Sequence, residues 1–251
     1  MLEPLSKESR SSLATLLNRE KRYGKAMAMW DQALLVDAED SHAWNGKSST
    51  AYHQGDYQRA LNYINAALWT INQESVVWGM LATGKSSFKQ RNEQTMRASY
   101  LFKRADIQLA QENVAGAIED YRTVHKEFPQ ETNKELMQKA TSATFKGQTS
   151  RSQMLLEALL ELSPDEPAHI NGYVVLATLY NNQGKNPAEW MNTVLKTLRA
   201  SKNPTKILDL VGLKLGLIGG ARFALPLYCE LVNTHHKPEY AANIRQIAQI
   251  I

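Results

Sequence analysis

The sequence predicts an all-α fold in which antiparallel helix pairs stack in a row to form an α-solenoid. Two observations lead to this prediction. The chain resembles itself at an interval of 34 residues, and the apolar side chains within each repeat have helical spacing. A third observation supports it, because no segment shows the alternation of strands and helices that a nucleotide-binding sheet requires. We therefore expect a single domain over residues 1–251.

The first repeats are the clearest. Five pairs of like residues lie 34 positions apart, namely Tyr23 and Tyr57, Ala26 and Ala60, Ala33 and Ala67, Leu34 and Leu68, and Trp44 and Trp78. Leu13, Leu16 and Leu17 share one helical face, and the pattern breaks at residues 20–22 before a second helix begins at Tyr23. Each unit is therefore predicted to be a helical hairpin.

The second unit, Ser41 to Glu74, resembles the tetratricopeptide repeat. The resemblance rests on Trp44, the small Ser48, Tyr52, Gly55 at the turn, Tyr57, Ala60 and Ala67. Small residues allow paired helices to approach closely, and glycine frees the backbone at a turn. The resemblance implies a right-handed α-solenoid of about six to seven hairpins, ending in a C-terminal capping helix.

A looser register continues toward the C-terminus. Its small residues are Ala105, Ala140, Ala177 and Gly212, and its turn glycines are Gly147, Gly184 and Gly219. We predict clear repeats over 7–74, an irregular segment over 75–97, degenerate repeats over 98–238 and a capping helix over 239–251. The expected helices are 6–20, 23–37, 41–54, 57–71, 75–90, 93–112, 114–128, 133–146, 149–162, 168–183, 187–201, 204–218, 221–234 and 238–250.

Aromatic side chains fall at helix-packing positions. Trp30, Tyr57, Trp69, Tyr121 and Tyr228 are spaced as core residues of packed helices. We therefore predict that they fill the core and do not form a ligand cage.

Composition favours a soluble protein and offers little chemistry. The net charge is +4, which is too small to argue for a nucleic-acid partner. Cys229 is the only cysteine, so no disulfide and no thiolate cluster for a metal is expected. His235 and His236 are adjacent and point apart, and no acid–base constellation is found. We expect no catalytic residue, no metal and no cofactor, and hence no enzyme.

The N-terminal segment lacks the apolar core of a secretory signal, since it carries charges and a proline. No stretch approaches the ~20 apolar residues that span a bilayer. We expect a cytoplasmic protein, or a periplasmic one if a signal or a larger chain has been removed.

The segment Gly79 to Ser86, GMLATGKS, matches the phosphate-binding P-loop pattern. The repeat register instead places Trp78, Leu81 and Lys85 along a helix over 75–90, whose N–H groups would bond within the helix. The tetrapeptide Gly46-Lys47-Ser48-Ser49 recurs as Gly84-Lys85-Ser86-Ser87, which favours a duplicated helix surface over a nucleotide site.

In proteins that this repeat resembles, the first helix of each pair lines a concave groove that holds a peptide or a partner helix. The corresponding positions here are Asn45, Ser49, Tyr52, His53, Phe102, Asp106, Met137, Thr141, Thr144, Val174, Thr178 and Asn181. Asn45 and Ser49 stand where the carboxylate-clamping members carry a lysine and an asparagine, so binding of chaperone tails is not expected.

Three functions are open from the sequence. The first is a non-catalytic scaffold or adaptor that binds a protein or peptide in the groove, with a bacterial secretion, envelope or polysaccharide assembly as a setting. The second is a helical-repeat RNA-binding protein, which would need a basic inner wall, whereas Asp106 is acidic. The third is an enzyme that uses Gly79–Ser86 as a P-loop.

Overall fold

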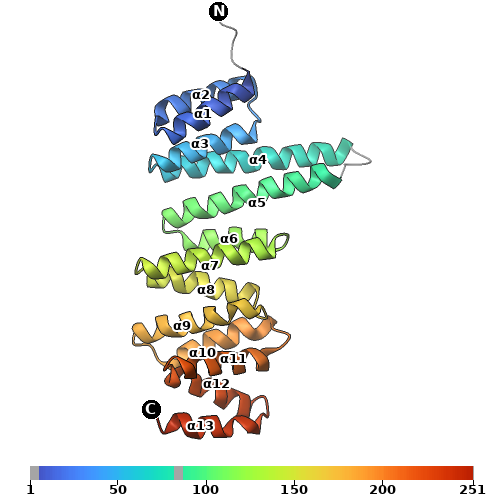
Figure 1. Cartoon of the computed structure of the whole chain (residues 1–251). Helices are drawn as coiled ribbons and strands as arrows, with labels where there is room; N and C mark the ends of the chain where they lie inside the picture. Colours follow the sequence, from blue (N-terminus) through green and yellow to red (C-terminus); the bar gives the residue numbers. More distant parts are fainter. Residues whose placement is uncertain (1–5, 82–86, 251) are drawn as a thin grey trace, which may run out of the picture. The chain divides into compact units, whose positions relative to one another are not determined.

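The computed structural model of the chain describes residues 6–81 and 87–250, except for the side chains of residues 7, 8, 72–81, 87–91 and 168. Within these residues the chain forms thirteen α-helices and three short 3₁₀ helices, with no strand (Figure 1). Contacts between residues divide the chain into two compact units, Met1–Phe128 and Pro129–Ile251, named unit 1 and unit 2.

Unit 1 holds three hairpins. They are α1 (Lys7–Arg19) with α2 (Tyr23–Val36), α3 (Ser41–His53) with α4 (Tyr57–Leu81), and α5 (Ser87–Ala110) with α6 (Val114–His125). Helices of successive hairpins also pack on one another, α2 on α3 and α4 on α5. The buried apolar residues form two clusters, one around Trp30 where α1, α2 and α3 meet, and one that runs from Ala51 of α3 to Val124 of α6.

Unit 2 holds three more hairpins and a final helix. They are α7 (Pro129–Phe145) with α8 (Thr149–Leu162), α9 (Ile170–Asn182) with α10 (Pro187–Thr197), α11 (Pro204–Leu217) with α12 (Ala221–Asn233), and α13 (Ala241–Ala248), which packs on α12. The 3₁₀ helices are η1 (Pro167–His169), η2 (Leu198–Ala200) and η3 (Pro238–Tyr240). The prediction of an all-α chain of about six to seven hairpins followed by a C-terminal helix is confirmed, with six hairpins among the described residues.

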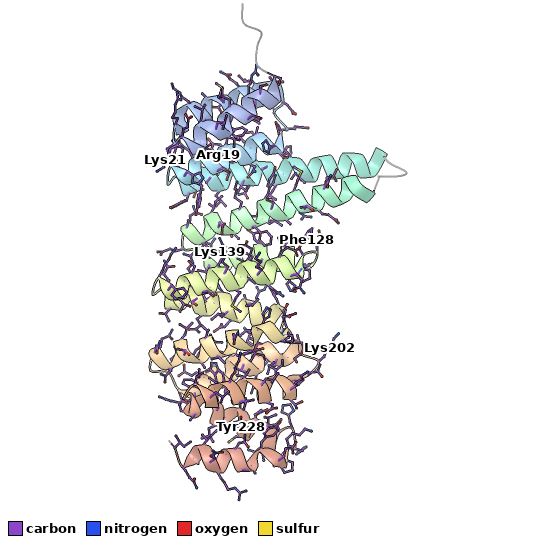
Figure 2. The ribbon with its side chains drawn as sticks, in the orientation of Figure 1. Arg19, Lys21, Phe128, Lys139, Lys202 and Tyr228 are labelled. Atoms are coloured by element: carbon purple, nitrogen blue, oxygen red, sulfur yellow. The ribbon has the colours of Figure 1, made fainter. Side chains whose placement is uncertain are left out.

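One residue in each hairpin turn has a positive φ. Gly55, Gly147, Gly184 and Gly219 take this conformation with φ between 65° and 80°, as the predicted turn glycines should. The turns of the first and third hairpins place Lys21 (φ 59°) and Glu112 (φ 63°) there instead, and Lys21 is labelled in Figure 2. The repeated feature is therefore the turn geometry, and glycine is its most frequent solution.

The tetrapeptide at residues 46–49 is a packing motif. A Cβ added at Gly46 would lie 2.4 Å from the Trp30 ring, so only glycine lets α3 approach α2 this closely. Lys47 Nζ lies 2.6 Å from Asp31 Oδ1 and 4.5 Å from the centre of the Tyr63 ring. Ser48 Oγ donates to the carbonyl oxygen of Ala60 at 2.8 Å, which joins α3 to α4. Each of these three residues thus has a structural role.

The predicted helix boundaries in the irregular segment are wrong. The expected helices 57–71 and 75–90 are one helix up to Leu81, and α5 begins at Ser87 where a break near residue 92 was expected. No glycine or proline lies between residues 71 and 75, so nothing in the sequence stops the helix at the 34-residue period. Trp78, Gly79 and Leu81 therefore end α4, the second helix of its hairpin, and do not begin a third pair.

Two helices of unit 1 are much longer than the others. α4 has 25 residues and α5 has 24, whereas the other described helices of unit 1 have 12 to 14. The far ends of α4 and α5 extend past the neighbouring helices of the unit in Figure 1. The extra length of α4 and α5 is the physical origin of the slip in the sequence register.

The core contains most of the predicted aromatic residues. Trp30, Tyr121 and Tyr228 are at most 3% exposed, and Tyr57 packs against the core of unit 1. Trp69 is 56% exposed, so the prediction that it belongs to the core is wrong. Helical spacing located it on α4, but spacing alone cannot show which part of a helix surface a neighbouring helix covers.

Candidate binding surface

Lys103 of α5 links two first helices of unit 1. Its Nζ donates to Asn45 Oδ1 of α3 at 2.8 Å and also to Ser49 Oγ. Asn45 and Ser49 are four residues apart and therefore lie on one face of α3. Three polar side chains thus meet between α3 and α5, and they are named the Lys103 cluster: Lys103, Asn45 and Ser49.

Burial alters the charge behaviour of this amine. Desolvation lowers the pKa of Lys103 from 10.5 to about 8, and the negative charge of Asp106 acts in the opposite direction. At neutral pH the amine is still mostly protonated. The ammonium group is a half-buried cation, and its two hydrogen-bond acceptors in α3, Asn45 and Ser49, are neutral. Such a cation can also donate a hydrogen bond to a carbonyl or carboxylate oxygen of a partner.

Aromatic rings continue the surface along α3. His53 is exposed, and its ring stacks on Tyr23 of α2 with centroids 6.3 Å apart. Tyr52 meets the His53 ring edge-on at 5.9 Å and also packs against Tyr57. His53 lies one turn beyond Ser49, so these rings follow the Lys103 cluster along the same helix.

Two predicted positions in α5 are partly turned toward neighbours within the unit. Phe102 is half-buried against the core, with its ring 6.0 Å from that of Tyr121 in α6. Asp106 is half-buried one turn after Phe102, where it influences Lys103. Of the six predicted positions in unit 1, Asn45 and Ser49 meet at Lys103, and His53 is the most accessible.

The predicted positions in unit 2 lie on α7 and α9. Thr141, Thr178 and Asn181 are exposed, while Met137, Thr144 and Val174 are half-buried. Thr144 hydrogen bonds to Ser152 Oγ at 2.6 Å, so it faces α8. Met137 lies against α9, since its methyl carbon is 3.7 Å from the position of a Cβ on Gly172.

Sequence reasoning missed Lys103 and Tyr23. Lys103 directly follows the predicted Phe102 but is not one of the positions that the repeat register turns toward the groove. Its long side chain nevertheless reaches Asn45 and Ser49 of α3. Tyr23 begins the second helix of its hairpin, and the sequence shows it only as a residue that recurs at the 34-residue interval. The signal for Lys103 would have been a lone lysine between Phe102 and Arg104 in a helix that must pack on α3.

The phosphate-binding pattern lacks its structural context where the chain is described. Gly79 and Leu81 lie in α4, so the pattern begins in a helix and does not follow a strand, and its residues 82–86 lie outside the described residues. Among the residues that are described, no three His, Cys, Asp or Glu side chains gather as a metal site would require. A search of the described helices also finds none long and apolar enough to cross a membrane.

Comparison with known proteins agrees with the repeat pattern. Residues 4–75 match the family model of the tetratricopeptide repeat. A search of curated protein sequences finds no match.

Solved structures of repeat proteins share low sequence identity with this chain. A tetratricopeptide repeat protein from Parabacteroides merdae is 17% identical, with 98% of this chain and 86% of that one covered at a TM-score of 0.44. YrrB, described as a TPR protein with an unusual peptide-binding site, is 12% identical over 79% of this chain and 89% of its own, also at 0.44.

The family match covers the two hairpins in which the 34-residue period is clearest, and the described helices continue as hairpins with the same turn geometry. Residues 4–75 are therefore similar to the tetratricopeptide repeat in sequence, and the helices that follow them continue the same hairpin pattern.

Proposed function

We propose that this protein is a non-catalytic scaffold that binds a protein or peptide on the first-helix side of unit 1. The observation that carries the proposal is the Lys103 cluster. It holds a half-buried cation between α3 and α5, next to the exposed ring of His53. A bacterial secretion, envelope or polysaccharide assembly is a candidate setting.

The chemistry of the cluster suits a polypeptide. Asn45 accepts from Lys103 through its oxygen, which leaves its amide N–H groups to donate to a partner. A desolvated cation and an oriented amide recognise carbonyl and carboxylate oxygens, while the Tyr52 and His53 rings offer rigid contact area. These groups can bind and orient a polypeptide chain.

The proposal is tested by capture of partners with matched variants. Tagged wild-type protein, Lys103→Glu and Lys126→Glu are used on the same extract, and captured proteins are identified by mass spectrometry. Lys126 is exposed at the end of α6, so it controls for charge reversal as such. We expect partners that bind wild type and Lys126→Glu to be lost with Lys103→Glu.

Unchanged capture of every partner by Lys103→Glu would contradict the proposed surface. Circular dichroism of each variant shows that loss of binding is not loss of fold. Filter binding of RNA at two salt concentrations tests the alternative that the protein binds RNA, because contacts with phosphates would make the affinity fall steeply as the salt concentration rises. The identity of the captured proteins then decides the setting.

A further inference from the structure

Unit 2 carries a second exposed face on its first helices, named the unit-2 face and formed by one stripe each of α7, α9 and α11. The stripes follow the register of the small residues Ala140, Ala177 and Gly212, with intervals of 37 and 35. Neighbouring stripes are connected. Met137 of α7 lies against Gly172 of α9, and Lys214 of α11 donates to Asn171 Oδ1 of α9.

The centre of the unit-2 face is less polar than its sequence suggests. Its middle row is Thr141, Thr178 and Leu213. The Thr141 hydroxyl donates to the Met137 carbonyl at 2.7 Å, and the Thr178 hydroxyl donates to the Val174 carbonyl at 3.0 Å. With their hydroxyls bonded inside their own helices, both threonines can present methyl groups to a partner.

One edge of the unit-2 face carries exposed apolar side chains on its two outer helices. The next row toward the helix C-termini contains Phe145, Asn182 and Leu217; Phe145 and Leu217 are 87% and 77% exposed, and Leu213 in the middle row is 55% exposed. α9 between them has no Asp, Glu, Lys or Arg in any of its 13 residues. Exposed apolar side chains gathered on one face mark a surface for a partner.

The opposite edge is basic. Lys134, Asn171 and Lys206 occupy equivalent positions near the N-termini of the three helices, and both lysines are exposed. The Lys214 side chain reaches back to Asn171 and adds a third ammonium group to this edge. Asp209 lies on the same helix, but it is half-buried and interacts with Tyr240. The unit-2 face therefore has an apolar band beside a row of positive charge.

We infer that the unit-2 face binds an amphipathic helix of a partner protein, with an apolar stripe and acidic side chains along one edge. The apolar stripe would cover Phe145, Leu213 and Leu217, and the acidic edge would meet Lys134, Lys206 and Lys214. Packed helices lie about 8–10 Å apart, so three of them span about 20 Å, which about 13 residues of a crossing helix would cover. The inference rests on the proposed scaffold function and names the class of partner for unit 2.

The test uses model helices and the full chain. A peptide of about 18 residues carries leucine on one face and a row of glutamates along one edge, long enough to be helical when bound. A second peptide keeps the leucine face and replaces the glutamates by lysines. Fluorescence anisotropy measures binding of each, and we expect the glutamate peptide to bind at least about tenfold more tightly.

Variants assign the binding to the unit-2 face. Leu217→Asp should weaken the glutamate peptide about tenfold or more, while Leu35→Asp, at a position 86% exposed on unit 1, should leave it unchanged. Lys134→Glu with Lys206→Glu should weaken it as well, and Lys196→Glu, exposed on α10, should not. Both leucines are exposed, so neither substitution removes a core contact.

Three results would overturn the inference. The first is equal binding of the glutamate and lysine peptides, and the second is no binding of either peptide. The third is unchanged binding of the glutamate peptide by Leu217→Asp. If Lys103→Glu abolishes peptide binding while Leu217→Asp does not, the helix sits on unit 1, and the scaffold function stands without the unit-2 face. Capture of natural partners tests the scaffold function separately.

Discussion

At the scale of single residues, helix packing and the proposed binding surface share one short segment of α3. Gly46 and Ser48 face α2 and α4, where they set how closely the helices approach, while Asn45 and Ser49 meet Lys103 on the other side. Neighbouring residues of one helix can therefore face the core and the proposed binding surface at once.

Gly46→Ala should destabilise unit 1 by about 1–3 kcal/mol, because the added methyl group overlaps the buried Trp30 ring. Gly24→Ala is the matched control in α2, since nothing lies within 4 Å of its Cβ position and alanine favours a helix by about 0.5–1 kcal/mol. Urea unfolding followed by circular dichroism measures both. Equal stability of the two variants would refute the close approach.

Lys103 should titrate with a midpoint near pH 8 in NMR spectra of its side chain, because burial disfavours the charged amine. Asp106→Asn should lower this pKa further, since the carboxylate favours the cation. A midpoint at the ordinary value of 10.5, or an increase after Asp106→Asn, would show that the amine is not held between α3 and α5 as described.

At the scale of helices, a buried ion pair holds three helices of unit 1 together. Arg104 of α5 forms a two-point contact with Asp120 of α6 at 2.5 and 3.0 Å, and its remaining nitrogen donates to Asn65 of α4 at 3.0 Å. The Asp120 side chain is 4% exposed. One guanidinium thus ties three helices of unit 1 together.

Asp120→Ala should cost about 3 kcal/mol of unfolding free energy, because it leaves the Arg104 charge without its buried partner. Glu119→Ala is the control one residue away. Its side chain is 72% exposed, and the pair with Arg122 is 3.6 Å long, so the loss should be below about 1 kcal/mol. Thermal or urea unfolding distinguishes the two, and equal losses would contradict the role of the buried pair.

Asp165 organises the loop before α11. The backbone N–H of Lys202 and the hydroxyl of Ser201 donate to its carboxylate, which lowers the pKa of Asp165 below 3.8. The carboxylate of Asp165 therefore binds a proton more readily in the unfolded chain than in the folded one. As a result, its hydrogen bonds stabilise the folded chain above pH 3.8, and this stabilisation is lost as the pH falls through the folded pKa.

Asp165→Asn should therefore lower the melting temperature at pH 6 more than at pH 3. Differential scanning calorimetry of wild type and variant at the two pH values measures the difference. If the difference in melting temperature between wild type and Asp165→Asn is the same at pH 6 and pH 3, Asp165 does not stabilise this loop through its ionised carboxylate.

At the scale of the whole molecule, the sequence predicts the kind of fold better than its details. The 34-residue period and the turn glycines are local signals, and they located the hairpins. The length of α4 was missed because the period marks where repeats recur and cannot show that a helix continues past its usual turn. Lys103 was missed because its reach depends on how two hairpins pack.

The central claim is that a partner binds on the first-helix side of unit 1. The most direct measurement places a photo-cross-linking amino acid at His53 in one variant and at Glu119 in another, both exposed, and compares the products formed in cells. Residue 53 lies on α3 beside the Lys103 cluster, whereas residue 119 lies on α6. We predict partner cross-links at position 53 and not at 119, and cross-links at 119 alone would contradict the account.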